Sequence, residues 1–273
     1  MSALLFAGVR IAGFRSLRAP RVSLSVIVIA KNEAPVIRRC LESVAWADEI
    51  IVLDSGSTDA TVEICRKCRA RVEATVDWPG FGVQKNRALA LATGEWVLSI
   101  DADEWVTEGL RAEIQEAMAM PGAHSAIRMP RLSSYCGRFL RHSGWWPDHV
   151  TRLFRRGQAR FSDDLVHERL IVESTVGTLR APLMHESYRN LEQVLAKVNA
   201  YSSAGAAMAR QHGRRASLGG AVLRGLWTFF RTYFLRAGFL DGREGFMLAV
   251  SNAEVTYYRS LKLMFLSEKS GTE

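Results

Sequence analysis

The 273-residue sequence is poor in cysteine and contains no long apolar segment. Four cysteines are too few for the disulfide framework of a small secreted domain. Cys65 and Cys68 form a C-x-x-C, but no second Cys or His pair stands at zinc spacing, so we expect a structural role inside a helix. There is no run of 18 apolar residues to form a transmembrane helix, and the opening segment lacks the basic start of a secretory signal. We therefore expect a cytoplasmic protein.

The signatures of several nucleotide-binding classes are also absent. No G-x-G-x-x-G follows the first expected strand and no G-x-x-x-x-G-K-S/T occurs, which disfavours a Rossmann dinucleotide fold and a P-loop NTPase. The sequence has no zinc-finger pattern, RNA-binding aromatic signature or long Lys/Arg run. We therefore expect no nucleic-acid partner.

The formal net charge of +8 is unevenly distributed. Residues 22–123 carry 10 Lys/Arg against 16 Asp/Glu, whereas residues 1–21 carry four Arg and no acid. Residues 201–273 carry 10 basic and 5 acidic residues. Basic segments around an acidic unit indicate an anionic partner, such as phosphate groups or a membrane surface. We expect a basic N-terminal extension up to residue 21, a main domain over 22–190 and a helical, basic C-terminal region over 191–273.

Strands and helices are expected to alternate along the first hundred residues. The segment "VSLSVIVIA" is an almost continuous β-branched run, typical of a strand covered on both faces. Asn32 is expected to cap the first helix, Ser57 or Thr58 to cap the second, and Gly94 to close the third. The alternation predicts an α/β fold with a doubly wound, mainly parallel, right-handed sheet and helices on both faces. The expected strands are 22–30, 50–53, 72–76 and 96–100, and the expected helices are 34–44, 58–68 and 83–92.

Polar residues follow three of the expected strands. Asn32 and Glu33 follow the first, Asp54 to Asp59 the second, and Asp101 to Asp103 the fourth. Each group read alone could be a solvated loop at a helix start. Ligands of doubly wound sheets, however, bind beyond the carboxyl ends of the strands, where these groups should converge. Such a site could bind a nucleoside diphosphate through Mg²⁺ or Mn²⁺, which prefer oxygen ligands.

The motifs "LSVIVIAKNE", "IIVLDSGSTDAT", "QKNRALALATGEWVLSIDADE" and "VHERL" resemble, in this order, those of family 2 glycosyltransferases, which have the GT-A fold. The resemblance covers residues 22–190, which makes this segment the expected catalytic domain. The whole chain, with "HESYRNLEQVLAKVNAYS" and "GFLDGREGF", is similar to bacterial transferases of the lipopolysaccharide inner core. The C-terminal region then extends the GT-A domain with helices.

The resemblance implies a set of residues that bind the nucleotide-sugar donor. Asp54 would accept a hydrogen bond from the base, and Lys85 or Arg87 would reach the base or the diphosphate. Asp101 would hold the ribose side, and Asp103 would bind the metal directly. For two of these residues a role outside the donor site stays open. Glu33 could belong to the first turn of a helix, and Lys85 could be a solvated helix residue. The implied donor site also includes Ala30, Asn32, Glu33 and Ala102.

The family inverts the anomeric centre in a single displacement, so the acceptor hydroxyl needs a general base. The resemblance implies an acid after the donor motifs, and the stretch "RFSDDLVHERL" provides Glu168 as first choice and Asp164 as second. His185 in "LMHESY" could complete the metal shell or be a core histidine. The expected cofactor is Mg²⁺ or Mn²⁺.

The acceptor side is less specific. The tryptophans of "GWWPD" could stack on a sugar or pack internally, and Arg131 could meet acceptor phosphates or face water. Within "LRGLWTFFRTYFLRAGF", Leu223, Trp227, Phe230 and Phe234 recur at helical spacing beside Arg224 and Arg231, with no acid. This basic amphipathic pattern suits an anionic membrane surface, although a helix packed on the domain gives the same period.

The resemblance, together with these observations, implies an inverting metal-dependent glycosyltransferase that moves glucose or a similar hexose from a UDP-sugar to a lipopolysaccharide core or another surface glycolipid or glycan. It would be peripheral on the inner face of the cytoplasmic membrane. One alternative is a polyprenyl-phosphate glycosyltransferase, which usually carries transmembrane helices. Another is a non-catalytic sugar-nucleotide or glycan-binding module, which would tolerate loss of the D-x-D and the base.

Overall fold

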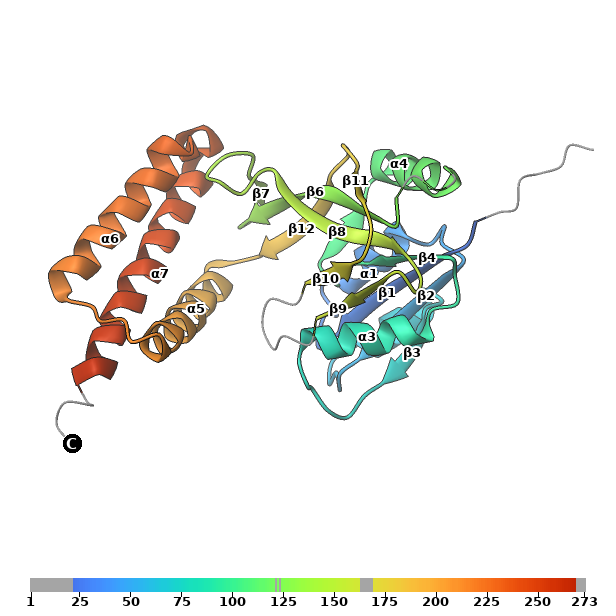
Figure 1. The fold of residues 1–273 in the computed structure, drawn as a ribbon, viewed down its shortest axis with the longest axis horizontal. Helices are drawn as coiled ribbons and strands as arrows, with labels where there is room; N and C mark the ends of the chain where they lie inside the picture. Colours follow the sequence, from blue (N-terminus) through green and yellow to red (C-terminus); the bar gives the residue numbers. More distant parts are fainter. Residues whose placement is uncertain (1–21, 121, 123, 163–168, 269–273) are drawn as a thin grey trace, which may run out of the picture.

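Two parts of the chain differ in their architecture, a helix-covered sheet and a group of long C-terminal helices (Figure 1). The structure is a computed structural model that describes residues 22–120, 122, 124–162 and 169–268. The expected basic extension over 1–21 therefore lies outside the described residues.

Parallel strands form the first half of the sheet. β1 pairs in parallel with β2 and with β4, and β2 pairs in parallel with β3. The predicted alternation of strands and helices is confirmed. Its elements are β1 (Leu24–Ala30), α1 (Ile37–Ser43), β2 (Glu49–Asp54), α2 (Thr61–Lys67), β3 (Arg71–Ala74), α3 (Phe81–Leu91) and β4 (Trp96–Ser99).

The second half of the sheet is mixed. The strand order is β3-β2-β1-β4-β8-β6-β12-β5, with β8 antiparallel to both β4 and β6, and β12 parallel to β6. β7 and β11 also pair with β6, while β9 and β10 form a separate ribbon. The elements are β5 (Glu104–Val106), α4 (Glu108–Ala119), β6 (Ala126–Tyr135), β7 (Arg138–Phe139), β8 (Asp148–Arg155), β9 (Ala159–Phe161), β10 (Leu170–Val172), β11 (Val176–Thr178) and β12 (Leu183–Tyr188).

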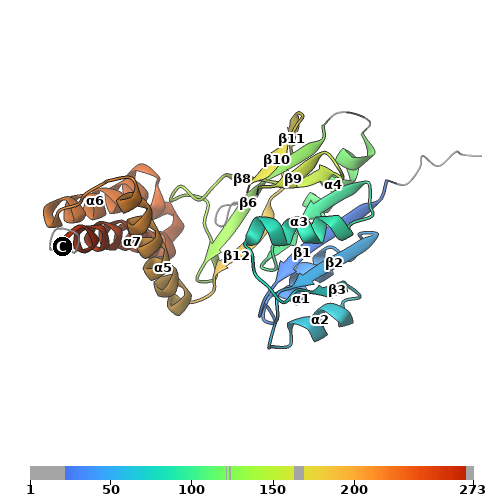
Figure 2. The same ribbon diagram turned by 60° about the horizontal axis from the view of Figure 1, so that its bottom comes forward.

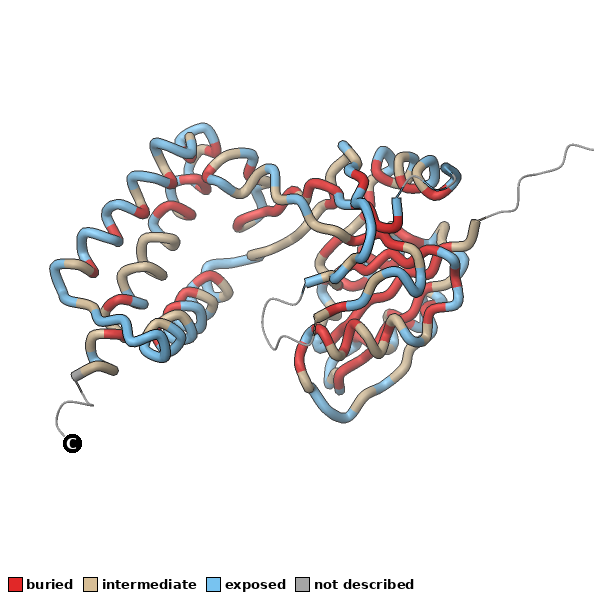
Figure 3. Tube along the Cα trace, in the orientation of Figure 1, coloured by how far each residue is buried: buried red, intermediate tan, exposed pale blue. Residues whose placement is uncertain are grey.

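Helices cover both faces of the sheet, as predicted. Alternate side chains of a strand point to opposite faces. Val26 and Val28 of β1 belong to a core with residues of α1, α2 and α4, whereas Ile27 and Ile29 belong to a core with α3 and β9. All of β1 is therefore buried, which is why its sequence is almost continuously apolar rather than alternating (Figure 3). Figure 2 shows the sheet and its helices from a second direction.

The expected helix ends are wrong in three places. α1 begins only at Ile37, because Asn32 has a positive φ of 57° and its side chain accepts a hydrogen bond from Thr58 N at 2.8 Å instead. α2 begins at Thr61, where Asp59 accepts from the Thr61 amide. α3 ends at Leu91, one residue before the expected end, and Ala92 rather than Gly94 follows its last turn. A Cβ on Gly94 would lie 2.7 Å from Ser25 N, so this glycine permits close approach to β1.

Helices make up the described part of the C-terminal region, as predicted. α5 (Leu191–Gln211) and α6 (Leu218–Phe230) are followed by the π-helical turn η1 (Arg231–Leu235), the 3₁₀ turn η2 (Gly238–Asp241) and α7 (Gly242–Glu268). A small core that includes Tyr135, Val194 and Leu248 joins this unit to the sheet. None of the described helices is long and apolar enough to cross a membrane.

Candidate active site

Hydrogen bonds join the two loops that follow the carboxyl ends of β1 and β2. The Asn32 amide donates to Ser57 Oγ at 2.9 Å, the Glu33 amide to Thr61 Oγ1 at 2.8 Å, and the Ala34 amide to Asp59 at 3.2 Å. The motif residues after β2 therefore fix the backbone of the loop after β1. This explains why short hydroxyl and carboxylate side chains stand there, and it brings the first two polar groups together.

Asp54 ends β2 opposite Ala30 and is 4% exposed. Its Oδ2 accepts from the amides of Gly56 and Ser57 at 3.1 and 3.0 Å, and its Oδ1 accepts from Ser57 Oγ at 2.5 Å. Gly56 has a φ of 80°, which the tight turn requires. Asp54 thus shapes the loop, and its lone pairs still leave room for a further donor because a carboxylate has about four acceptor positions.

Asp101 is held between two cations from other elements. Lys85 Nζ of α3 lies 2.9 Å from its Oδ1, and Arg152 Nη2 of β8 lies 2.5 Å from its Oδ2. Burial alone would raise the pKa of Asp101, but Arg152 and Lys85 outweigh it and hold that pKa well below its usual range. Lys85 is buried rather than solvated, and its ammonium faces Asp101.

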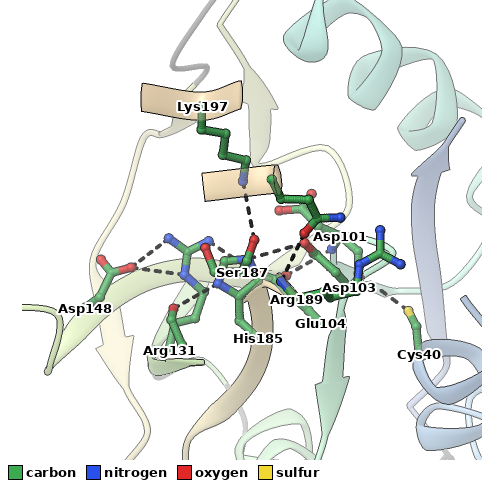
Figure 4. A network of polar contacts seen from close by, with 12 residues as sticks. Cys40, Asp101, Asp103, Glu104, Arg131, Asp148, His185, Ser187, Arg189 and Lys197 are labelled. Carbon is green, nitrogen blue, oxygen red and sulfur yellow. Dashed lines mark hydrogen bonds and ion pairs between the residues drawn. The ribbon is translucent and has the colours of Figure 1, made fainter. Parts of the chain in front are cut away.

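Glu104 extends this network across the sheet (Figure 4). It is fully buried, and its Oε1 lies 2.6 Å from Arg152 and 3.3 Å from Arg131. Arg131 also pairs with Asp148 at 2.7 Å. Arg131 therefore pairs with the buried Glu104 and with the partly exposed Asp148, so carboxylates engage its guanidinium. The charges of the buried Glu104 and of Asp101 are each compensated by cations of this network.

Asp103 faces His185 of β12. His185 Nε2 lies 3.4 Å from Asp103 Oδ2, while Nδ1 faces Ser133 Oγ at 2.9 Å. The backbone supports this pairing, since the Glu186 amide donates to the Asp103 carbonyl at 2.9 Å. His185 is thus not a core histidine remote from the acids. Among the described residues no group of three or more His, Cys, Asp or Glu side chains is arranged to hold a metal.

Two cations near the end of β12 complete the surroundings, and the sequence analysis missed both. Lys197 of α5 lies over the Tyr188 ring at 4.5 Å and donates to Ser187 O at 3.4 Å, two residues after His185 (Figure 4). Arg189 stands in the connection between β12 and α5. Burial lowers the pKa of Lys197, while the carboxylates of Asp103 and Glu33 oppose that shift. Burial also raises the pKa of Glu33, with Asp103 raising it further and Arg189 lowering it.

The other expected residues behave differently. Arg87 is bound by Asp77 at 2.6 Å, on the exposed side of α3. Ala102 is buried between Asp101 and Asp103. Trp145 stacks on Tyr188 at 5.8 Å, so it packs internally. Glu168 and Asp164, proposed as the general base, lie outside the described residues.

The cysteines have the expected structural character. Cys65 lies inside α2 and is fully buried, and Cys68 follows the last residue of that helix. Burial raises the pKa of Cys65 to about 11, so it is a neutral thiol at ordinary pH.

Comparison with known proteins agrees with this geometry. Residues 25–173 match the family described as Glycosyl transferase family 2. An uncharacterized glycosyltransferase of Rickettsia bellii (strain RML369-C) is 31% identical over 89% of this chain and 87% of its own. The lipopolysaccharide core biosynthesis glycosyltransferase LpsC of Rhizobium meliloti (strain 1021) is 29% identical over 89% of this chain and 93% of its own.

Solved structures are also similar to parts of the chain. Glucosyl-3-phosphoglycerate synthase from Mycobacterium tuberculosis, crystallised with Mn²⁺, uridine diphosphate and glucosyl-3-phosphoglycerate, is 27% identical. The match covers 41% of this chain and 44% of that one, with a TM-score of 0.35. With a family match over more than half of its residues, this chain belongs to glycosyl transferase family 2 and is a glycosyltransferase.

Proposed function

We propose that the enzyme transfers glucose or a similar hexose, with inversion, from a UDP-linked donor to the core of lipopolysaccharide. The observation that carries the proposal is the pairing of Asp103 with His185 at 3.4 Å, beside Ser187, whose carbonyl oxygen accepts from Lys197 at 3.4 Å. A relative at 29% identity is named for lipopolysaccharide core biosynthesis, which supports the acceptor class.

The donor would lie across the carboxyl ends of β1, β2 and β4. Asp54 would accept from the base beside Ala30 and Asn32, on the loop that its own hydrogen bonds hold in shape. Asp101 would accept from the ribose, because its charge is retained by Lys85 and Arg152 over the whole ordinary pH range. Lys85 would then act through Asp101, and Arg87 would be peripheral.

Asp103 and His185 suit a divalent cation shared with a diphosphate. A carboxylate oxygen and an imidazole nitrogen are ordinary Mn²⁺ ligands, and Ser133 orients the ring so that Nε2 faces Asp103. Two protein ligands leave several coordination positions for phosphate oxygens and water. When bound, Mg²⁺ or Mn²⁺ neutralises negative charge on the diphosphate.

The transfer is a single displacement. The acceptor oxygen forms a bond to the anomeric carbon as the bond from that carbon to the diphosphate oxygen breaks, and the acceptor's hydroxyl proton passes to a carboxylate base. Glu168 is our first assignment for the base, with Asp164 second. The leaving diphosphate takes the electron pair of the broken bond.

Lys197 and Arg189 would stabilise the departing diphosphate. Arg189 follows β12 and Lys197 stands in the second turn of α5, and both act electrostatically on the acids of the site. A partly desolvated ammonium interacts more strongly with a developing charge than a solvated one does. The helical unit would therefore be part of the catalytic machinery. The enzyme would be cytoplasmic and bound to the inner face of the membrane.

Transfer and donor hydrolysis across a panel of nucleotide sugars test the proposal, with truncated lipopolysaccharide as acceptor. We expect activity with a UDP-hexose, β-linked or otherwise inverted product, and loss of activity in excess chelator. Full activity in excess chelator would contradict the proposed requirement for a divalent metal. Transfer to polyprenyl phosphate in preference to lipopolysaccharide would contradict the acceptor.

A further inference from the structure

A basic cavity lies in the C-terminal helical unit, apart from the active site. Its volume is about 410 Å³, and residues from the end of α5, the following loop, α6 and α7 line it. Four of the lining side chains are arginines and one is a histidine, and no acid is among the lining residues. They are His212, Arg214, Arg215, Arg224 and Arg259.

The positive charges of these arginines are not balanced by neighbouring carboxylates of the described chain. Within the described parts of the chain, no carboxylate forms an ion pair with Arg214, Arg215, Arg224 or Arg259. All four side chains are exposed, so solvent screens their mutual repulsion, and together they give this concave surface a positive potential that an anion can neutralise. The backbone makes room for this arrangement. A Cβ on Gly205 would lie 2.8 Å from Cδ of Arg259, so a glycine allows that side chain to cross α5.

An apolar surface adjoins the cavity on α6. The buried residues of α6 are small, Ala221, Gly225 and Thr228, and the last two contact α7, whereas the large side chains of α6 are exposed. Trp227 and Phe230 stack with ring centroids 6.0 Å apart, and Phe230 contacts Phe234 at 5.2 Å. Contiguous exposed apolar patches of this kind mark interaction surfaces. The exposed set is Val222, Leu223, Leu226, Trp227, Phe230, Phe234 and Leu235.

Arg224 belongs to both features. It lines the cavity and stands one turn before Trp227 on α6, while Arg231 follows the last residue of α6 and begins η1. Positive side chains therefore border the apolar surface along one edge. Apolar residues flanked by arginines are the arrangement that an anionic bilayer interface favours.

We propose that this cavity binds the phosphate of an anionic phospholipid head group while the apolar surface of α6 enters the interface. Arginine suits this ligand because its planar guanidinium donates two parallel hydrogen bonds to phosphate oxygens. The surface without the cavity would bind any bilayer, whereas the four arginines select lipids with exposed negative charge. The inference rests on the proposed membrane location of the enzyme and gives it a defined lipid site.

Co-sedimentation of the full chain with vesicles tests the site. We expect binding to phosphatidylglycerol vesicles and much weaker binding to phosphatidylcholine vesicles. Arg214→Ala/Arg215→Ala should weaken binding to phosphatidylglycerol by about tenfold or more, since each basic residue near an anionic surface contributes about 1 kcal/mol. Arg224→Ala should also weaken binding to phosphatidylglycerol vesicles, by a smaller factor. The control is Arg66→Ala/Arg160→Ala, which removes two exposed arginines from the sheet domain and should leave binding unchanged.

Three results would overturn the inference. One is equal loss of binding in the control pair, because net charge alone would then explain it. Another is binding of inorganic phosphate to the cavity arginines with no dependence of vesicle binding on them, which would make the site one for free phosphate. The third is no vesicle binding at all with concentration-dependent dimerisation, which would assign the α6 surface to a second copy. Transfer to a detergent-dispersed acceptor should persist in the Arg214→Ala/Arg215→Ala variant, so failure of the lipid site is distinguishable from failure of the proposed function.

Discussion

His185 Nε2 lies 3.4 Å from Asp103 Oδ2, across the antiparallel pairing of β12 with β5. The register sets His185 opposite Glu104, one residue after Asp103, so the sheet itself brings imidazole and carboxylate together. Ser133 on the parallel neighbour β6 holds the other ring nitrogen. Three strands from different parts of the sequence therefore define this pair.

Asp103→Asn should lower transfer by about a hundredfold or more, because a metal contributes several kcal/mol of charge stabilisation. His185→Ala should instead raise the Mn²⁺ concentration for half-maximal activity by about tenfold. Steady-state transfer rates across a Mn²⁺ titration measure both effects. Glu63→Gln on exposed α2 is the matched control and should change neither. Unaltered Mn²⁺ dependence in His185→Ala would remove His185 from the metal site.

Arg152→Met should destabilise the fold by at least about 3 kcal/mol, because it leaves Glu104 and Asp101 without their shared guanidinium. Urea unfolding monitored by circular dichroism measures the change. Lys67→Met breaks the exposed pair with Glu63 and should cost at most about 0.5 kcal/mol. A change in Arg152→Met no larger than in this control would mean that the network contributes little.

The stability that this network gives the fold depends on pH, and the direction of that dependence follows from the pKa of Asp101. The pKa of Asp101 is lower in the folded protein than the ordinary Asp value of about 3.9. The stabilisation is therefore complete above that value and declines as the pH falls below it. Wild-type stability should fall in this acidic window, and Asp101→Asn should flatten that part of the pH profile. Identical slopes in the two proteins would contradict the assignment.

Much of the fold was predictable because its signals are local. The β-branched runs and the helical segments between them gave four parallel strands in order, and the rule for carboxyl ends placed Asp54 and Asp101 on one edge. The helix starts were not predictable in the same way. Asn32 has the side chain of a helix cap but accepts from Thr58 of the neighbouring loop, and Asp59 accepts from Ala34 of the other loop as well as from Thr61 at the start of α2.

The partners of the acids could not be read from the sequence. Arg152 stands in the antiparallel strand β8, whose insertion beside β4 has no local signal, and Lys197 stands on a helix that folds back from beyond the sheet. The spacing of Leu223, Trp227 and Phe230 favoured membrane contact but left packing on the domain open. Their exposure shows that the stripe does not pack on α7, which instead contacts the small residues of α6.

Asp241 should prove essential for holding the helical unit on the sheet domain. It is buried and accepts from the amides of Arg141 and His142, both at 3.0 Å, and from Ser143 Oγ at 2.9 Å. Asp241→Ala leaves these donors unsatisfied and should cost about 2–4 kcal/mol. Thermal unfolding and proteolysis of the folded variant measure the loosening. Asp77→Ala, which removes an exposed carboxylate, is the control, and equal protease resistance in all three proteins would contradict the role.

Lys197→Met should lower the turnover number while leaving donor affinity nearly unchanged, because the proposed role is stabilisation of charge that develops on the leaving diphosphate. A loss of about tenfold to a hundredfold is expected for one charged donor in a partly desolvated site. Lys197→Arg should restore part of the rate, whereas a purely structural role would be served by Met. Single-turnover rates and nucleotide binding separate the two effects. An equal loss in donor affinity would assign Lys197 to ground-state binding instead.

The general base decides whether the acceptor half of the mechanism is right. A base acts on the acceptor, whereas Asp103 acts on the donor, so their variants should differ in kind. Glu168→Gln keeps the size of the side chain and removes its proton-accepting charge, so it should lower turnover by about a hundredfold or more with nucleotide binding unchanged. Asp164→Asn should have a much smaller effect under the same assay. A dead Asp164→Asn with an active Glu168→Gln would move the base by four residues. If both variants stayed active, the base would have to lie elsewhere, while the donor site built from Asp54, Asp101 and Asp103 would be unaffected by that result.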